Sequence, residues 1–211
     1  MNNSLQEYLN FANKLADVAG ITSMEYFRTS LSIDNKSDES PVTIADKNTE
    51  LKIRSLIENE YPDHGILGEE FDSVNPDAEF IWVIDPIDGT RSYIAGHKDF
   101  GNLISLTQNK KPIIGIINCP AHDERWVGAK NQSSTVNQQT VNTSNVTEIE
   151  DAYIFTSGLY FDEPHLRNAV DKIKNKVRYF RYGGDCYMYG MVASGLIDIV
   201  IEDTLKVHDY M

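Results

Sequence analysis

Basic residues are scarce in this sequence: 19 lysines and arginines stand against 32 aspartates and glutamates, which gives a formal net charge of −13. Because phosphate backbones are bound by basic surfaces, this balance argues against nucleic acid as a partner. It also disfavours a small anionic substrate, unless fixed cations stand between that substrate and the carboxylates. An acidic site that acts on a phosphate would therefore have to be a metal site.

Long apolar runs and cysteine motifs are missing too. No stretch approaches the ~18 apolar residues that span a bilayer, and the N-terminal MNNSLQEYLN lacks the basic and apolar regions of a signal peptide. The sequence thus predicts a cytoplasmic protein with no membrane partner. Cys119 and Cys186 have neither CxxC spacing nor a histidine cluster nearby, which indicates reduced, structural thiols and no thiolate metal site.

Two long helices are predicted at the start of the chain. Apolar residues over 5–27 recur at intervals of three and four, and Ser4 with Glu7 forms a capping box. After a polar stretch, a second helix is expected over 43–59, where Thr43 opens it and a Tyr-Pro pair follows it. The chain therefore begins with a helical layer.

A sheet is predicted next. Residues 80–85, FIWVID, form an apolar run rich in β-formers, which predicts a buried strand whose carboxyl end delivers Asp85 into a loop. The polar segment 131–147 is interpreted as an exposed loop or edge segment. Three further strands, expected to form an antiparallel meander, are predicted at 100–107, 112–118 and 124–130.

The remaining residues alternate between strands and helices, which is typical of an α/β region. We place a boundary near residue 148, with an N-terminal α+β domain at 1–147 and a C-terminal α/β region at 148–211. The second region is expected to hold a strand at 152–157, a helix after Pro164, a strand at 176–180, a helix at 184–194 and a strand at 198–202.

Acidic residues recur where the chain turns or an element begins. The stretch WVIDPIDGT places Asp85 and Asp88 three apart on one turn, with Gly-Thr directly behind. Glu69 lies in a GEE sequence before the same strand, Asp46 in the first turn of the second helix, and Asp209 at the end of the chain. Mg²⁺ binds a few carboxylates that converge from separate segments, so this set offers a magnesium site.

Acidic residues in loops and at helix starts are often caps or solvated charges, and other metal or phosphate motifs can also contain them. Asp46 fits a helix cap as well as a functional role, and Glu70 fits a solvated charge better than a ligand. An EF-hand loop starting at Asp85 fails, because Ile87 and two glycines would occupy liganding positions. Aspartyl-phosphate enzymes of the haloacid dehalogenase type have one residue between their two aspartates, whereas here Pro86 and Ile87 stand between Asp85 and Asp88. The Walker loop of many phosphate-binding proteins is absent from the sequence.

WVIDPIDGT, with GEE and TIAD upstream and HDY downstream, resembles the inositol monophosphatase family of Mg²⁺-dependent, Li⁺-sensitive phosphatases. The resemblance implies a first metal bound by Glu69, Asp85 and the backbone carbonyl of Ile87, with Glu69 also taking part in catalysis. It implies a second metal bound by Asp85, Asp88 and Asp209. Hydrolysis of a small phosphate monoester would then proceed by direct attack of a metal-activated water, without a phosphoenzyme.

The same resemblance assigns roles around the phosphate. Asp46 and Thr90 match the pair that orients and deprotonates the attacking water. Gly89 and Thr90, next to Asp88, fall where the family contacts the substrate phosphate, and a glycine there lets the backbone approach closely. Lys36 falls where the family often has a lysine, although a solvated loop lysine fits equally well.

RYGGDCYMYGMVASGLIDIVIEDTLKVHDY is similar to the histidinol-phosphatase branch of that family. Histidinol phosphate carries an ammonium and an imidazole group, so a site for it should add carboxylates. Asp185, preceded by Gly183 and Gly184, stands where inositol-specific members have a small residue, and Glu202 stands at the family's substrate-contact position. A helix N-cap or first-turn acid at the start of the 184–194 helix is the alternative for Asp185. His208 is interpreted as a neighbour of the metal site and not as a ligand.

The end of the chain departs from the family pattern. Several dozen residues follow the metal aspartate in the family, whereas this sequence stops two residues after Asp209. The resemblance therefore implies a layered αβαβα sandwich with a truncated C-terminal layer, and it implies a homodimer. Inositol 1-phosphate or a related sugar or nucleotide phosphate is the alternative substrate. A truncated, non-catalytic protein that keeps the fold and binds a partner is the alternative of another class.

Overall fold

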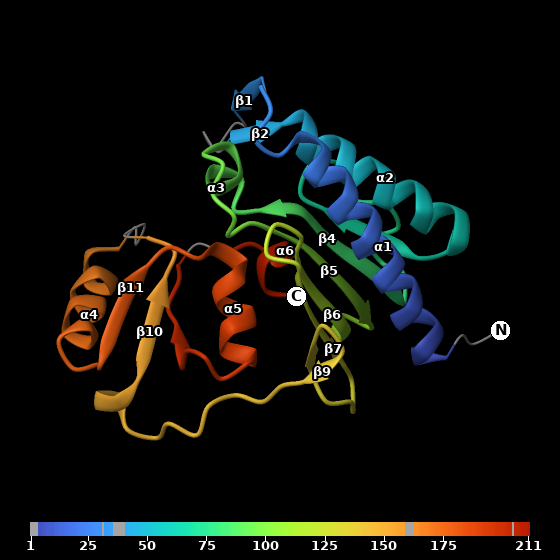
Figure 1. Ribbon diagram of the computed structural model, residues 1–211. Helices are drawn as coiled ribbons and strands as arrows, with labels where there is room; N and C mark the ends of the chain where they lie inside the picture. The colour runs from blue at the N-terminus through green and yellow to red at the C-terminus, as the bar shows by residue number, and fades with distance from the viewer. Residues whose placement is uncertain (1–3, 31, 36–40, 159–162, 204) are drawn as a thin grey trace.

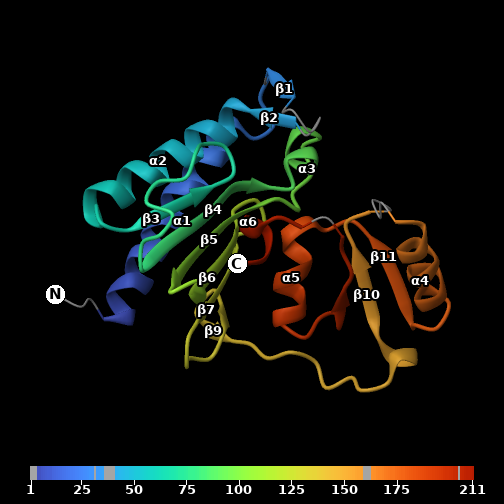
Figure 2. The same ribbon diagram turned by 180° about the vertical axis from the view of Figure 1, so that it is seen from behind.

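Layers of helices and sheets alternate across the molecule. Two helices, α1 (Leu5–Tyr26) and α2 (Ile44–Glu60), cover one face of a large sheet, and α5 (Asp185–Ala193) lies on its other face (Figures 1 and 2). Beyond α5 stand a small sheet and then α4 (Pro164–Lys174). The predicted layered α/β architecture is confirmed. The computed structural model describes residues 4–30, 32–35, 41–158, 163–203 and 205–211.

The two N-terminal helices begin at the predicted caps. Ser4 Oγ accepts from the Glu7 backbone N–H at 3.3 Å, and Glu7 Oε2 accepts from the Ser4 N–H at 2.8 Å. Thr43 and Asp46 form the same reciprocal box at the start of α2. The buried stripe of α1 includes Leu15, which packs in one core with residues of α2 and the large sheet. Both predicted helices are confirmed.

The large sheet has seven strands in the order β3-β4-β5-β6-β7-β8-β9, and only its first pair is parallel. The predicted antiparallel meander is confirmed as β5, β6 and β7. Sequence analysis missed β3, because its residues GILG contain two glycines and only two apolar residues. The strands are β3 (Gly65–Gly68), β4 (Phe80–Asp88), β5 (Gly101–Gln108), β6 (Lys111–Cys119), β7 (Glu124–Ala129), β8 (Thr135–Val136) and β9 (Gln139–Thr140).

The strand that carries the two aspartates is longer than predicted. The expectation that it ends at Asp85 is wrong: β4 continues to Asp88, and its pairing with β5 is irregular between these two residues. Pro86 has no N–H to donate to a neighbouring strand, which favours a bulge at this point. The bulge carries both aspartates within the strand instead of leaving them on a free loop.

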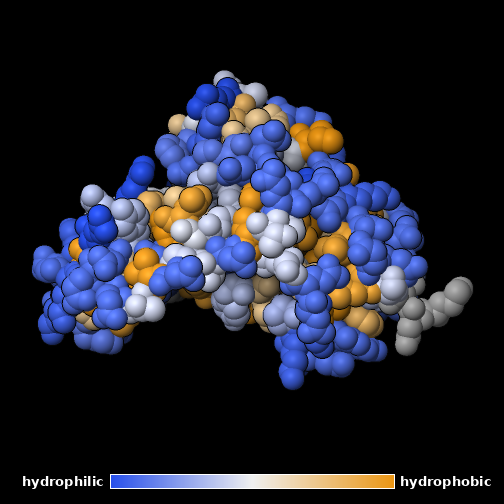
Figure 3. Space-filling model, turned by 60° about the horizontal axis from the view of Figure 1, so that its bottom comes forward, coloured by the Kyte–Doolittle hydropathy of each residue, from blue (hydrophilic) through white to orange (hydrophobic). Residues whose placement is uncertain are grey.

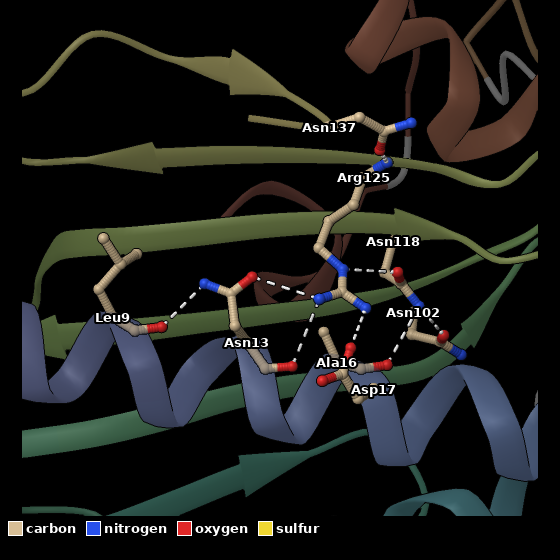
Figure 4. Close-up of polar contacts among 8 residues, drawn as sticks. All are labelled: Leu9, Asn13, Ala16, Asp17, Asn102, Asn118, Arg125 and Asn137. Atoms are coloured by element: carbon tan, nitrogen blue, oxygen red, sulfur yellow. Dashed lines mark hydrogen bonds and ion pairs between the residues drawn. The ribbon is translucent and has the colours of Figure 1, made fainter. Parts of the chain in front are cut away.

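A line of polar side chains docks α1 onto the sheet and reaches this bulge. Arg125 points from β7 toward α1, where its guanidinium donates to Asp17 at 2.7 Å, and it also donates to Asn118 at 2.8 Å (Figure 4). Asn118 in turn donates to Asn102 Oδ1 at 2.8 Å. Asn102 Nδ2 donates to the Pro86 carbonyl at 2.7 Å, so the bulge is tied to the core.

The second sheet is parallel, with the order β11-β10-β12. Its alternation of strands and helices is as predicted, except that β11 starts three residues later than expected. The predicted boundary near residue 148 falls between the last strand of the large sheet and the first of the small one. The remaining elements are β1 (Ile33–Asn35), β2 (Pro41–Thr43), α3 (Thr90–Ile94), η1 (Ile149–Asp151), β10 (Tyr153–Thr156), β11 (Tyr179–Tyr182), β12 (Ile199–Val200) and α6 (Val207–Tyr210).

The surface and the thiols agree with the composition. Hydrophilic residues cover most of the face seen in Figure 3, and apolar residues show through toward its centre. A membrane-spanning helix is not found among the residues that the structure describes. Cys119 and Cys186 are free and buried, as expected for structural thiols.

Candidate active site

Acidic side chains from distant parts of the chain converge on Asp85. Ligand atoms of Asp85, Asp88 and Asp209 lie within 4.8 Å of one another, and so do those of Glu69, Asp85 and His208. Asp85 and Asp88 lie on β4, and Glu69 lies in the loop after β3. His208 and Asp209 lie on α6. The structure thus brings together the four carboxylates that the sequence predicts as metal ligands.

Burial makes this carboxylate group unfavourable without a cation. Asp85 is 2% exposed, and burial together with the neighbouring carboxylates raises its pKa well above the ordinary value. Burial and the charge of Asp185 raise the pKa of Asp88 to about 7. In the metal-free protein, the folded chain therefore binds protons more tightly than the unfolded chain. Its stability falls as the pH rises from the ordinary carboxyl range through the raised pKa values. A cation would neutralise the same repulsion, so the donor set fits a metal ion.

Glu50 positions the loop that carries Glu69. The Glu50 side chain is fully buried, where Oε1 accepts from Arg54 Nε at 2.7 Å and Oε2 accepts from the Glu70 backbone N–H at 2.8 Å. Gly68 leaves room for it, since a Cβ there would lie 1.9 Å from Glu50 Oε1. Sequence analysis missed Glu50, because a Glu–Arg pair four apart on a helix is equally typical of an exposed surface.

The two glutamates of this loop are expected to differ sharply when substituted. Glu69→Gln should lower kcat/KM for phosphate release by about a hundredfold, because its carboxylate is one of the candidate metal ligands. Glu70→Gln should change it by less than about threefold, since Glu70 contacts Glu50 through a backbone N–H that the variant keeps. Steady-state assays of the two variants at saturating Mg²⁺ would check this. Equal losses would show that the wrong member of the pair has been assigned.

Asp46 serves as a helix cap and also faces the site. Its Oδ2 accepts from the backbone N–H of Thr43 at 2.8 Å and from the Thr43 hydroxyl at 2.6 Å. Its Oδ1 lies 3.4 Å from Thr90 Oγ1, which is also 3.1 Å from the carbonyl of Ile87. Burial raises the pKa of Asp46, which makes it a stronger base than an exposed aspartate. The capping and catalytic interpretations of Asp46 are therefore compatible.

The backbone after Asp85 is held in place by short-range contacts. The Ile87 N–H donates to Asp85 Oδ1 at 3.0 Å. Gly89 has a φ of 78°, in the left-handed region that favours glycine, and it caps α3. Asp88 Oδ2 accepts from the backbone N–H of Cys186 at 2.7 Å. The turn that carries Gly89 and Thr90 is thus fixed from both regions of the chain.

A second pair of carboxylates, Asp185 and Glu202, lines a cavity together with Asp88 and Asp209 of the candidate metal ligands. The cavity has a volume of about 690 Å³, and its lining includes Asp88, Asp185, Glu202 and Asp209. Asp185 is not the N-cap of α5, which is Gly184, but it is the acidic residue of the first turn, so that part of the structural alternative agrees with its position. Burial raises the pKa of Asp185 above its ordinary range. The two predicted substrate carboxylates therefore line one cavity with Asp88 and Asp209, two of the predicted metal ligands.

Hydroxyl groups that the sequence did not mark hold this second pair. Ser92 Oγ donates to Asp185 Oδ2 at 2.5 Å, and Tyr189 Oη donates to Glu202 Oε2 at 2.6 Å. The backbone N–H of Ser157 donates to Glu202 Oε1 at 3.2 Å. Serine and tyrosine are common in every kind of site, so no local signal identifies these partners.

Three further predictions differ in outcome. Gly183 lines the cavity and has a φ of 92°, whereas Gly184 has a φ of 124° and packs near Met188. His208 lies among the candidate ligand atoms, with Nε2 3.9 Å from a Glu69 oxygen. Lys36 lies outside the described residues.

The model of the inositol monophosphatase family matches residues 4–211. This chain belongs to the inositol monophosphatase family. The resemblance carried by WVIDPIDGT is thereby confirmed at the level of the family.

Two relatives of this chain are named as phosphatases, which are phosphoric monoester hydrolases. The chain is 38% identical over 209 residues to a bifunctional phosphatase, IMPL2, of Arabidopsis thaliana chloroplasts, covering 98% of this chain and 60% of that protein. It is 36% identical to a histidinol-phosphatase of Chlorobaculum parvum, covering 95% of this chain and 78% of that protein.

Solved structures of the inositol monophosphatase family share this fold. An inositol monophosphatase from Zymomonas mobilis superposes with a TM-score of 0.88 at 40% identity, over 99% of this chain and 81% of that one. The chain thus spans between three fifths and four fifths of the length of these proteins. The predicted inositol monophosphatase type of sandwich is confirmed.

Proposed function

We propose that this chain is a magnesium-dependent phosphatase whose substrate is histidinol phosphate, a small phosphate monoester with a cationic alcohol. The observation that carries the proposal is one cavity whose lining includes Asp185 and Glu202 together with Asp88 and Asp209, two of the four candidate metal ligands. Family membership supports the phosphatase chemistry. The name of the Chlorobaculum relative agrees with the substrate.

Magnesium fits the donor set because it prefers hard oxygen ligands and keeps several waters. Glu69, Asp85 and the Ile87 carbonyl would hold one ion. Asp85, Asp88 and Asp209 would hold another. Ions bound there would supply Lewis-acid stabilisation of the phosphoryl oxygens and a more acidic bound water. The carboxylates themselves keep the site negative until such ions bind, so a phosphate ester is repelled from the metal-free protein.

Asp46 and Thr90 are placed to remove a proton from the attacking water. The Thr90 hydroxyl can donate toward Asp46 Oδ1, 3.4 Å away, and this leaves its lone pairs to accept the proton of the water. Asp46 is the final acceptor, and its raised pKa suits it to hold that proton. Gly89 lets the backbone approach the phosphate closely, since no side chain stands between them.

Asp185 and Glu202 would recognise the leaving alcohol. Inositol offers only neutral hydroxyls, and desolvating a charged carboxylate against them returns little beyond ordinary hydrogen bonds. A cationic amino alcohol adds charge-assisted bonds, each worth about 1.5–3 kcal/mol where neutral ones give about half. The pair therefore favours a cation next to the phosphate.

The test is phosphate release from histidinol phosphate and inositol 1-phosphate, side by side, with Mg²⁺ and with EDTA. We expect release to require Mg²⁺ and kcat/KM to be at least roughly tenfold higher for histidinol phosphate. A preference for inositol 1-phosphate would support the inositol-1-monophosphatase alternative. No release from well-folded protein, including from p-nitrophenyl phosphate, would support the non-catalytic alternative.

A further inference from the structure

Ser92 joins the two regions of the chain next to the cavity. It lies on α3, and its hydroxyl donates to Asp185 Oδ2 at 2.5 Å across 93 positions of sequence. It belongs neither to the metal group nor to the pair that takes the proton in the proposed reaction. The cavity lining nevertheless includes Ser92 together with Asp185.

The contact is close because Gly89 carries no side chain. A Cβ at Gly89 would lie 2.9 Å from the Cβ of Asp185 and 3.0 Å from its Cγ. Gly89 and Ser92 are three positions apart, and residues so spaced on a helical turn share one side. The stem of Asp185 therefore rests on Gly89 while its carboxylate meets Ser92.

Asp185 begins α5, and the next backbone N–H, that of Cys186, donates to Asp88 Oδ2 at 2.7 Å, so the backbone is held and the carboxylate is the part that needs a partner. Asp185 has a φ of 40° and follows two glycines that also have positive φ. Rotation about the last side-chain bond of an aspartate is broad, so an unheld carboxylate would sample many orientations. The Ser92 hydroxyl restricts this rotation by holding one oxygen.

The remaining oxygen of Asp185 is available to a ligand. Among the residues that the structure describes, only Oδ2 accepts a hydrogen bond, from Ser92. Glu202 lines the same cavity, and its negative charge acts on Asp185. A lysine or arginine at this position would neutralise the charge of Asp185. The Ser92 hydroxyl is neutral, so it orients Asp185 and leaves its negative charge for a cation to meet.

We propose that Ser92 is a positioning residue for substrate specificity, which holds Asp185 Oδ2 so that Oδ1 faces the ammonium group of a cationic leaving alcohol. This inference rests on the proposed function and deepens it. Ser92 acts through Asp185 and touches neither the phosphate nor the attacking water. Its loss should therefore weaken binding of the cationic substrate and leave the chemical step intact.

Ser92→Ala is the test, assayed with histidinol phosphate and inositol 1-phosphate at saturating Mg²⁺. We expect KM for histidinol phosphate to rise about tenfold, with kcat changed by less than about twofold. Both constants for inositol 1-phosphate should stay within about twofold. Ser92→Thr, which keeps the hydroxyl, should restore KM to within about threefold of the parent.

Ser144→Ala is the matched control, because the Ser144 hydroxyl donates to Asp198, a carboxylate in the second region that does not line the cavity. Ser144→Ala should leave kcat and KM for both substrates as in the parent. If Ser92→Ala is unfolded at the assay temperature by circular dichroism, Ser92→Cys repeats the test with a side chain of similar size and a weaker donor. A KM for histidinol phosphate that rises above that of the parent, with both constants for inositol 1-phosphate unchanged, would support the proposal, and an unchanged KM would count against it.

Four outcomes would overturn the inference. Equal losses on both substrates, or failure of Ser92→Thr to restore KM, would mean that Ser92 is merely structural. A variant Asp185→Ala that loses the preference while Ser92→Ala keeps it would refute the role of Ser92 and leave the proposed function standing. A parent protein without any preference for the cationic substrate would refute both.

Discussion

Asp85→Asn is expected to lower kcat/KM for phosphate release by at least about a thousandfold, equivalent to about 4 kcal/mol of transition-state stabilisation. Asp85 belongs to both groups of candidate ligands, so its charge serves two ions at once. It is also buried, and an amide cannot replace its charge there. Titration calorimetry with Mg²⁺ should show binding weakened in the same variant.

A matched substitution separates this effect from a general loss of charge. Asp77→Asn removes one negative charge from an exposed position that belongs to neither candidate ligand group. It should leave turnover and Mg²⁺ binding as in the parent. If Asp85→Asn bound Mg²⁺ like the parent, the assignment of the metal site would be wrong.

Asp185→Ala is expected to narrow the preference for histidinol phosphate over inositol 1-phosphate by about ten- to a hundredfold, the size of one charge-assisted hydrogen bond. The reason is that the variant removes the carboxylate proposed to face the cationic alcohol and leaves the candidate metal ligands in place. Values of kcat/KM for both substrates would measure it. The inositol 1-phosphate value should change little.

The backbone at this position calls for a second variant. Asp185 has a φ of 40°, which asparagine tolerates better than alanine does. Asp185→Asn therefore removes the charge with less backbone strain. It should narrow the preference for histidinol phosphate over inositol 1-phosphate about as much as Asp185→Ala does. If the preference survived in both variants, Asp185 would not recognise the substrate, and only the family-level chemistry would remain supported.

Local signals explain which parts of this fold could be predicted from the sequence. The capping residues Ser4 and Thr43 and the apolar periodicity of α1 and α2 depend on neighbours a few positions away. The aspartates of WVIDPIDGT could be recognised because a short motif holds them. The bulge after Asp85 was missed because it depends on how β4 pairs with β5, which is a property of two strands.

The supporting residues of the site could not be predicted for the same reason. Glu50 becomes a buried anchor only when the β3–β4 loop folds over it, and nothing in α2 alone distinguishes it. Ser92 meets Asp185 across 93 positions, and Tyr189 meets Glu202 from another element. A single sequence contains these residues but not the pairings that give them a role.

The polar line from Arg125 to Pro86 has a consequence for how the protein is made. Arg125 meets Asp17 across 108 positions, and Asn118 donates to the Ala16 carbonyl across 102 positions. Contacts of such long range form late, after the loops between them close. Because synthesis runs from the N-terminus, α1 and both aspartates of the bulge leave the ribosome before Arg125 of β7 is made. During that interval the first helix lacks its ion pair with Arg125, and the nascent chain is more exposed to aggregation than the finished fold.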